Sequence, residues 1–103
     1  MVTVTVWIKQ GVLGRLSPPM RRCKGRLVDF YEARGLDFFI TSKGEGNHCS
    51  SSCHYEDNAI DFKRQRVAKE DIEVICEKLY KNCFDVVEYS DIRDIFHVEY
   101  DPK

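Results

Sequence analysis

Two of the three histidines stand near carboxylates along the chain, in combinations that suit a metal ion. His54 is followed seven residues later by Asp61, and His97 is preceded three residues earlier by Asp94. Two imidazoles and one carboxylate form a donor set suited to zinc, and they leave a fourth tetrahedral position for water, as catalytic zinc sites require. His54, Asp61 and His97 are therefore a candidate zinc site, with Asp94 as a spare carboxylate able to accept a proton from that water.

The polar residues around His54 admit a second interpretation. Cys49 and Cys53, together with His48 and His54, could form a structural zinc cluster, although Cys-rich structural sites normally recruit a second pair of ligands from elsewhere in the chain. In the structural cluster His48 is a metal ligand. If the zinc is instead held by His54, Asp61 and His97, His48 is either a hydrogen-bond donor beside the metal or a polar loop residue. The spacing of these residues alone does not choose between the two interpretations.

Two further features of the sequence also have two possible interpretations each. Glu99 lies two residues after His97, and therefore on the same face of a strand, where it either orients the imidazole or is a solvated side chain. Residues 63–66 read KRQR, a short basic run that is either a solvated strand end or a binding site for an anionic glycan or phosphate.

The histidine segments resemble a known family. Residues 52–61 read SCHYEDNAID and resemble the S-x-H-x-x-G-x-A-x-D signature of the zinc D-alanyl-D-alanine carboxypeptidases, which share their fold with the hedgehog signalling domain. Residues 94–97 read DIFH and resemble the closing D-x-x-H element of that family. Small phage and prophage peptidoglycan peptidases resemble the chain further, through the blocks ITS, GNH, SCHY, AIDF and HVEYDP, which follow one another between residues 40 and 102.

This resemblance implies a function and assigns roles to residues. It implies one Zn²⁺ per chain held by His54, Asp61 and His97, with Asp94 as the catalytic base. The other residues that it implicates are His48 in catalysis and Ser42, Lys43 and Ser52 in substrate binding. The implied reaction is that of a peptidoglycan peptidase of endolysin type, which hydrolyses a stem-peptide bond next to a D-amino acid. Removal of a terminal D-Ala and cleavage between L-Ala and D-Glu both remain open.

The chain departs from the family pattern at three points outside the predicted metal ligands, and one of them is Ile95, where the small phage members often have the first histidine of a closing H-x-H. Asp57 stands where the signature has glycine, and Lys43 stands in the stretch where many members carry an arginine. Lysine supplies the positive charge but not the bidentate fork of a guanidinium group. An alternative is therefore a zinc-containing wall-binding or phage assembly module that has lost turnover. A third possibility is a structural zinc protein that contacts partners through residues 63–66.

The predicted strands are those that would hold the ligands. Alternating β-branched and aromatic residues over residues 2–8 predict a strand, and β-rich segments predict four more at residues 36–41, 59–62, 84–89 and 95–100. Residues 42–58 contain almost no aliphatic side chains and are expected to form an exposed loop. Trp7, Phe38, Phe39 and Phe62 are expected in the core.

Two amphipathic helices are predicted between these strands. The first begins at Ser17, which can cap it, followed by Pro18, and it ends at Gly35. Its expected buried stripe consists of Met20, Cys23, Leu27 and either Phe30 or Tyr31. The second is marked by Ile72, Ile75, Cys76, Leu79 and Cys83. The element order predicts a single α+β domain over residues 1–103, with a mainly antiparallel sheet and a hedgehog-like or DD-peptidase-like fold.

Composition limits the remaining classes of function. The 103 residues suffice for one domain, and 43% hydrophobic residues argue against disorder. A formal net charge of −1 offers no basic field for nucleic acid, and no apolar run is long enough to span a membrane. We expect a monomer with five reduced cysteines, made in the cytoplasm without a signal peptide, that reaches the wall through a lysis partner or from a virion.

Overall fold

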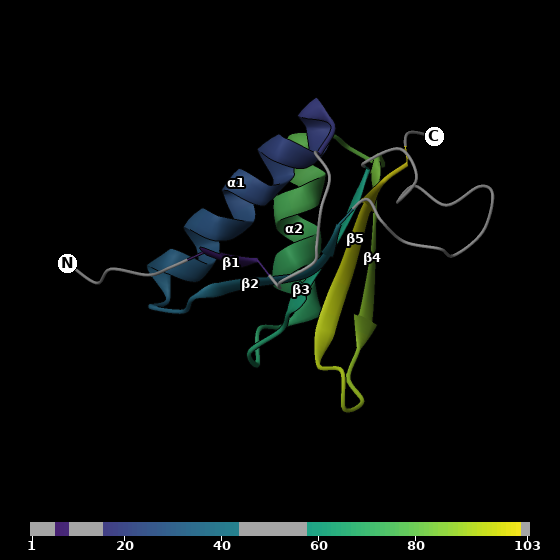
Figure 1. Cartoon of the computed structure of the whole chain (residues 1–103). Helices are drawn as coiled ribbons and strands as arrows, with labels where there is room; N and C mark the ends of the chain where they lie inside the picture. Colours follow the sequence, from purple (N-terminus) through teal and green to yellow (C-terminus); the bar gives the residue numbers. More distant parts are fainter. Residues whose placement is uncertain (1–5, 9–15, 44–57, 102–103) are drawn as a thin grey trace.

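The computed structural model describes residues 6–8, 16–43 and 58–101. Helices α1 (Pro18–Ala33) and α2 (Lys69–Leu79) lie on one face of a five-stranded sheet (Figure 1). The strands are β1 (Val6–Ile8), β2 (Phe38–Lys43), β3 (Ala59–Lys63), β4 (Phe84–Tyr89) and β5 (Ile95–Tyr100). Their order in the sheet is β1-β2-β3-β5-β4, with β1 parallel to β2 and every other neighbouring pair antiparallel. The predicted α+β class is confirmed, and the finer likeness to the hedgehog fold stays a prediction.

Helix α1 buries the stripe that its sequence predicts. Met20, Cys23, Leu27 and Tyr31 are the buried residues, so Tyr31 and not Phe30 completes the stripe. The predicted cap at Ser17 is wrong, because the hydroxyl makes no capping hydrogen bond and is buried without a partner among the described residues. Pro19 at the second helical position has no N–H, so the hydroxyl lacks one of the two donors that an N-cap side chain usually binds.

The ends of both helices are set by local backbone geometry. Gly35 adopts a φ of 71° after α1, and the Leu36 N–H then donates to the Tyr31 carbonyl, as expected of a left-handed helix terminus. Helix α2 ends at Leu79, since Tyr80 is already extended. The prediction that Cys83 lies on the stripe of α2 is therefore wrong: this residue is half-buried in the turn before β4.

The strands lie close to their predicted positions, with one shift. β4 and β5 coincide with the predicted segments, whereas β2 begins two residues later than expected and extends to Lys43. Residues 42 and 43 are thus strand and not loop, because β2 continues to pair with β3 past an irregularity between Ile40 and Ser42. Phe38 and Phe62 are buried as predicted, and Phe39 is only partly buried. The side chain of Trp7 and most of the predicted loop lie outside the described residues.

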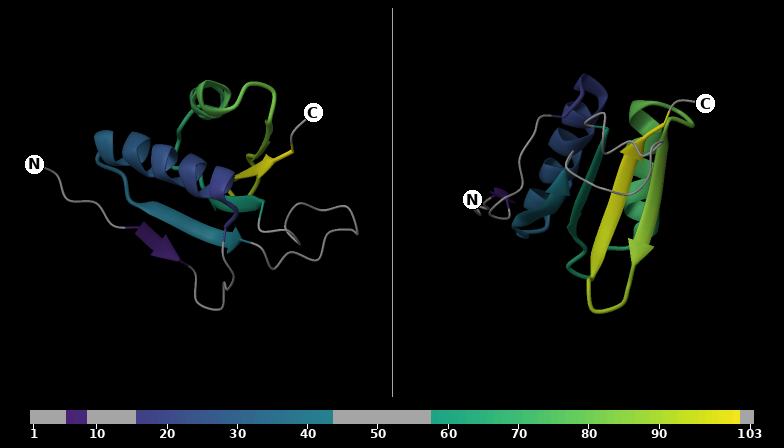
Figure 2. Two further views of the ribbon diagram at one scale, coloured as in Figure 1. Left: turned by 90° about the horizontal axis from the view of Figure 1, so that it is seen from above. Right: turned by 45° about the vertical axis from the view of Figure 1, so that its right-hand side comes forward.

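The sheet has two faces of opposite character. Both helices cover one of them, here called the helix face, where Ile60, Phe62, Phe96 and Val98 are fully buried (Figure 2). Alternation along the strands directs Asp61, Asp85, His97 and Glu99 to the other, here called the polar face. Within the part of the chain that the structure describes, neither helix is long and apolar enough to cross a membrane.

Candidate metal centre

Pairing of β3 with β5 brings two of the predicted ligands together. Asp61 stands directly opposite His97 in the antiparallel register, although the two residues are 36 positions apart in the chain. The Oδ1 atom of Asp61 lies 2.7 Å from Nδ1 of His97, and the side chains are only 15% and 12% exposed. Because their neighbours Phe62 and Phe96 are buried in the core, both side chains project from a well-packed part of the sheet.

Glu99 lies at the other end of the same imidazole. Its Oε1 atom is 2.7 Å from Nε2 of His97, so that the ring stands between two carboxylates. Burial by itself lowers the pKa of His97, but the hydrogen bonds with Asp61 and Glu99 outweigh burial and raise the pKa above its usual value. Without a cation between them, the two carboxylates thus favour an imidazole that donates from both nitrogens.

The geometry of Asp61 and His97 is compatible with zinc. Zinc–nitrogen and zinc–oxygen bonds of about 2.0–2.1 Å in a tetrahedral arrangement hold two ligand atoms about 3.3 Å apart. The observed 2.7 Å would have to widen by roughly half an ångström, which small side-chain rotations allow. If an ion replaced the proton between Nδ1 and Asp61, Nε2–H would still donate to Glu99, and this would be the carboxylate–histidine arrangement that orients metal ligands in general.

Asp94 lies away from this pair, in an ion-pair cluster at the end of the β4–β5 hairpin. Its Oδ1 atom accepts a hydrogen bond of 2.8 Å from Nε of Arg64, and Nη1 of Arg64 lies 3.1 Å from Glu88. Glu88 is paired with the buried Phe96, so it belongs to the helix face, and the Arg64 guanidinium lies 5.9 Å from the Phe96 ring. The contacts therefore place the Asp94 carboxylate toward the helix face, whereas Asp61 lies on the polar face.

Two other features agree with this placement of Asp94. Tyr31 of α1 donates its hydroxyl to the carbonyls of Lys63 and Arg64, and its pKa is raised by burial first and by the charge of Asp94 second. Asp94 also has a φ of 49°, an uncommon conformation for a residue other than glycine, and its backbone carbonyl accepts a hydrogen bond from Arg64. The turn thus holds Asp94 by both its backbone and its side chain.

The remaining predicted site residues lie outside what the structure describes. His48, Ser52 and the third predicted ligand His54 belong to residues 44–57. Ser42 and Lys43 lie on β2, with Ser42 in register opposite Asp61, but their side chains are outside the described part. The structure therefore brings together Asp61, His97 and Glu99 from the predicted set, and it sets Asp94 apart from them.

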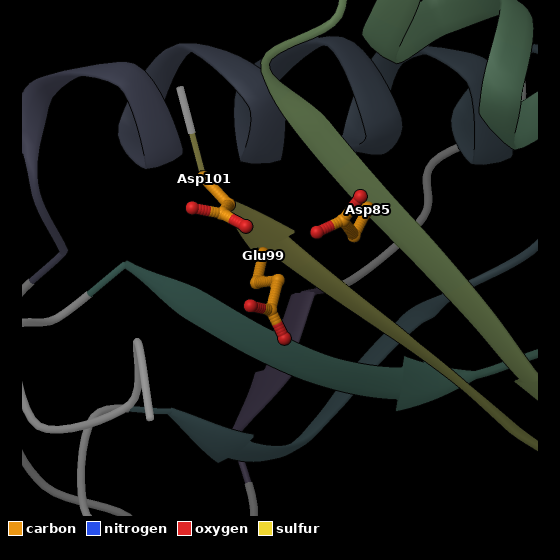
Figure 3. A group of neighbouring side chains, drawn as sticks. All are labelled: Asp85, Glu99 and Asp101. Carbon is orange, nitrogen blue, oxygen red and sulfur yellow. The ribbon is translucent and has the colours of Figure 1, made fainter. Parts of the chain in front are cut away.

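Two acidic neighbours of Glu99 were not predicted from the sequence. Asp85 of β4 stands opposite Glu99, and Asp101 follows β5, so that one carboxylate oxygen from each of the three lies within 4.8 Å of the others (Figure 3). The period-2 alternation of both strands could have placed Asp85 and Glu99 on one face, but only the hairpin register puts them opposite one another. Half-buried acidic groups at a strand end often occur without an ion, and this cluster alone does not define a second metal site.

Comparisons with known proteins add no family assignment. No model of a known protein family matches this chain, and no curated protein matches it. The functional interpretation therefore rests on the sequence motifs and on the arrangement of the described residues.

Proposed function

We propose that this protein is a zinc-dependent peptidoglycan peptidase that hydrolyses a stem-peptide bond next to a D-amino acid. The observation that carries the proposal is the contact between Asp61 and His97, with Glu99 behind the imidazole. Asp61 comes from one motif block of the sequence and His97 and Glu99 from another, and β3–β5 pairing brings the two blocks together at one half-buried point. The family resemblance assigns ligand roles to Asp61 and His97, and the contact with Nε2 of His97 supports an orienting role for Glu99.

Different residues of the chain have different roles in such a site. Asp61 and His97 hold the ion together with His54, and Glu99 keeps the His97 ring in the required tautomer. When bound, zinc supplies a Lewis acid that polarises the scissile carbonyl and makes water nucleophilic near neutral pH. Asp94 is the proposed proton acceptor, which must then leave Arg64 and reach the polar face when substrate binds. His48, Lys43, Ser42 and Ser52 are the proposed substrate-side groups.

The contact between Asp94 and Arg64 favours a second candidate function. A carboxylate bound by a guanidinium group on the side of the helix face is poorly placed to accept a proton beside Asp61. A protein that retained its metal ligands but used Asp94 only to brace the hairpin would bind the wall without cutting it. The alternative is therefore a non-catalytic zinc-containing wall-binding or phage assembly module.

A peptidoglycan digest tests the peptidase proposal against this alternative. Zinc-loaded protein is incubated with purified peptidoglycan, and the fragments are identified by mass spectrometry. The peptidase produces new stem-peptide termini next to a D-amino acid, and Asp94→Asn lowers turnover about 10²- to 10⁴-fold, as loss of a general base does, with zinc content unchanged. Asp91→Asn, three residues earlier in the same turn, is the matched control and should cleave like wild type.

The outcomes separate the two functions. Release of fragments by wild type and by Asp91→Asn, but not by Asp94→Asn, supports the peptidase mechanism. Equal cleavage by Asp94→Asn removes Asp94 from the mechanism. Zinc-loaded wild type that binds the wall and releases no fragment supports the module.

The metal requirement has its own test. We expect one zinc per chain by elemental analysis, and His54→Ala or His97→Ala should lose most of it, because each removes one of three protein ligands. Cys49→Ala and Cys53→Ala should retain it. Loss of zinc from the cysteine variants instead would support the structural cluster.

A further inference from the structure

Two buried cysteines touch each other between the helices. The Sγ atoms of Cys23 on α1 and Cys76 on α2 lie 3.8 Å apart, and the residues are 0% and 2% exposed. A disulfide bond is about 2.05 Å long, so the sulfurs need to approach by about 1.7 Å. Rotation of two short side chains with a slight approach of the helices is enough, because the thiols already point at one another.

We propose that Cys23 and Cys76 form an intramolecular disulfide that fastens α1 to α2 when the chain folds in the presence of a low-molecular-weight disulfide such as glutathione disulfide. The inference is independent of the proposed metal centre, because both thiols lie in the helix layer, whereas Asp61 and His97 lie on the polar face of the sheet. The reduced pair is the form that a reducing compartment maintains.

The reaction is a thiol–disulfide exchange. The thiolate of one cysteine attacks the small disulfide, which forms a mixed disulfide and releases one small thiol. The second cysteine then attacks the protein sulfur of the mixed disulfide and releases the second small thiol. Two protein S–H bonds are replaced by one S–S bond, the external disulfide is reduced to two thiols, and the two protons leave on them.

The surroundings of the pair determine when this exchange occurs. The contact with the Cys76 thiol, and then burial, raise the pKa of Cys23 far above its usual value, so almost no thiolate forms in the folded protein. The small disulfide also cannot reach sulfurs that are buried in the core. Oxidation therefore occurs during folding, before α1 and α2 are stably packed against each other. The folded reduced protein reacts slowly.

The cross-link would stabilise the fold. It closes a loop across 53 positions of sequence that contains β2 and β3, and it thereby restricts the unfolded chain. For a domain of this size we expect the melting temperature to rise by about 10 °C or more. Cys83 provides the contrast among the described cysteines, since its half-buried Sγ donates to the Lys81 carbonyl and lies in the turn before β4.

Refolding with and without the oxidant tests the proposal. The full chain carrying Cys49→Ser, Cys53→Ser and Cys83→Ser retains only the proposed pair. After refolding with glutathione disulfide it should be lighter by two hydrogen atoms than the reduced protein, contain no titratable thiol and melt about 10 °C or more above the reduced form. The matched control adds Cys76→Ala, and it should show neither the internal bond nor the rise in melting temperature.

Peptide mapping of the wild-type chain makes the test independent of whether the variant folds. A linked pair of peptides that contain Cys23 and Cys76 supports the proposal. Recovery of these cysteines as free thiols, as adducts of the small thiol or as links to other cysteines overturns it. Oxidation of the folded reduced protein as fast as during refolding would overturn the inferred timing.

Discussion

The two faces of the sheet use the same strands for different purposes. On the helix face, Phe62 and Phe96 pack with their ring centroids 5.7 Å apart and are fully buried. On the polar face, their neighbours Asp61 and His97 are half-buried and hold each other by one short polar contact. A single step along β3 or β5 thus changes a side chain from one that stabilises the fold to one that is available for chemistry. The core therefore positions the proposed site without contributing atoms to it.

Phe96→Ala and His97→Ala test this division on adjacent residues of β5. Phe96→Ala should lower the free energy of unfolding by about 3–5 kcal/mol, because it removes a fully buried aromatic side chain and leaves a cavity. His97→Ala should lower the free energy of unfolding much less and should instead remove most of the bound zinc. Urea unfolding and elemental analysis measure the two effects. If both substitutions destabilise the fold equally, the distinction between the faces is wrong.

Glu99→Gln tests, within the polar face, whether the carboxylate that faces His97 contributes to zinc affinity. It keeps the shape of the side chain but removes the charge that faces Nε2 of His97, so zinc affinity should fall about 10- to 100-fold. Competition with a chromogenic chelator measures the change. Asp85→Asn removes the carboxylate opposite Glu99 on the same face and is the matched control, expected to bind zinc like wild type. An equal loss in both variants would show that only the summed negative charge matters.

Tyr31→Phe probes a polar contact on the helix face. The Tyr31 hydroxyl, 3.0 Å from each of the Lys63 and Arg64 carbonyls, is lost while the ring remains in the core. Loss of a partly buried hydrogen bond should lower the free energy of unfolding by about 1 kcal/mol, measured by urea denaturation. Zinc content should not change, and a change would show that the end of β3 influences the ligand positions.

Asp91→Asn should have the smallest effect on stability among the substitutions that probe folding. Hydrogen bonds from the exposed Arg93 lower the pKa of Asp91 to about 2. Because the folded-state pKa lies below that of the unfolded chain, this small stabilisation is fully present above about pH 4 and is lost as the pH falls through about 2. Thermal melts should thus show a slight deficit of the variant at neutral pH that vanishes near pH 2. A deficit that grows on acidification would contradict the assigned pKa.

Local pattern predicted much of this arrangement. The stripe Met20, Cys23 and Leu27 identifies α1, and Gly35 ends that helix through a backbone conformation that glycine adopts without strain. Alternation in β3 separates Asp61 from Phe62 whatever strand lies beside it. These predictions succeed because helix and strand periods depend on residues a few positions apart. Cys83 was misassigned for the same reason: its spacing continues the period of α2, but Tyr80 has already left the helix.

The contacts of the proposed site depend on residues far apart in the sequence. Alternation made Asp61 and His97 polar-face residues, but only the β3–β5 register set them opposite one another, and a slip of one residue would have separated them. The sequence suggested that Asp94 is free beside His97. In the structure its carboxylate instead accepts a hydrogen bond from Arg64, which is 30 positions away in the chain. Cys23 and Cys76 were predicted as separate core residues, and the packing of α1 on α2 made them neighbours. Sequence therefore determined which side chains each element presents to each face. Tertiary structure decided which of them meet, because register and helix packing minimise the free energy of the whole core and not of any one segment.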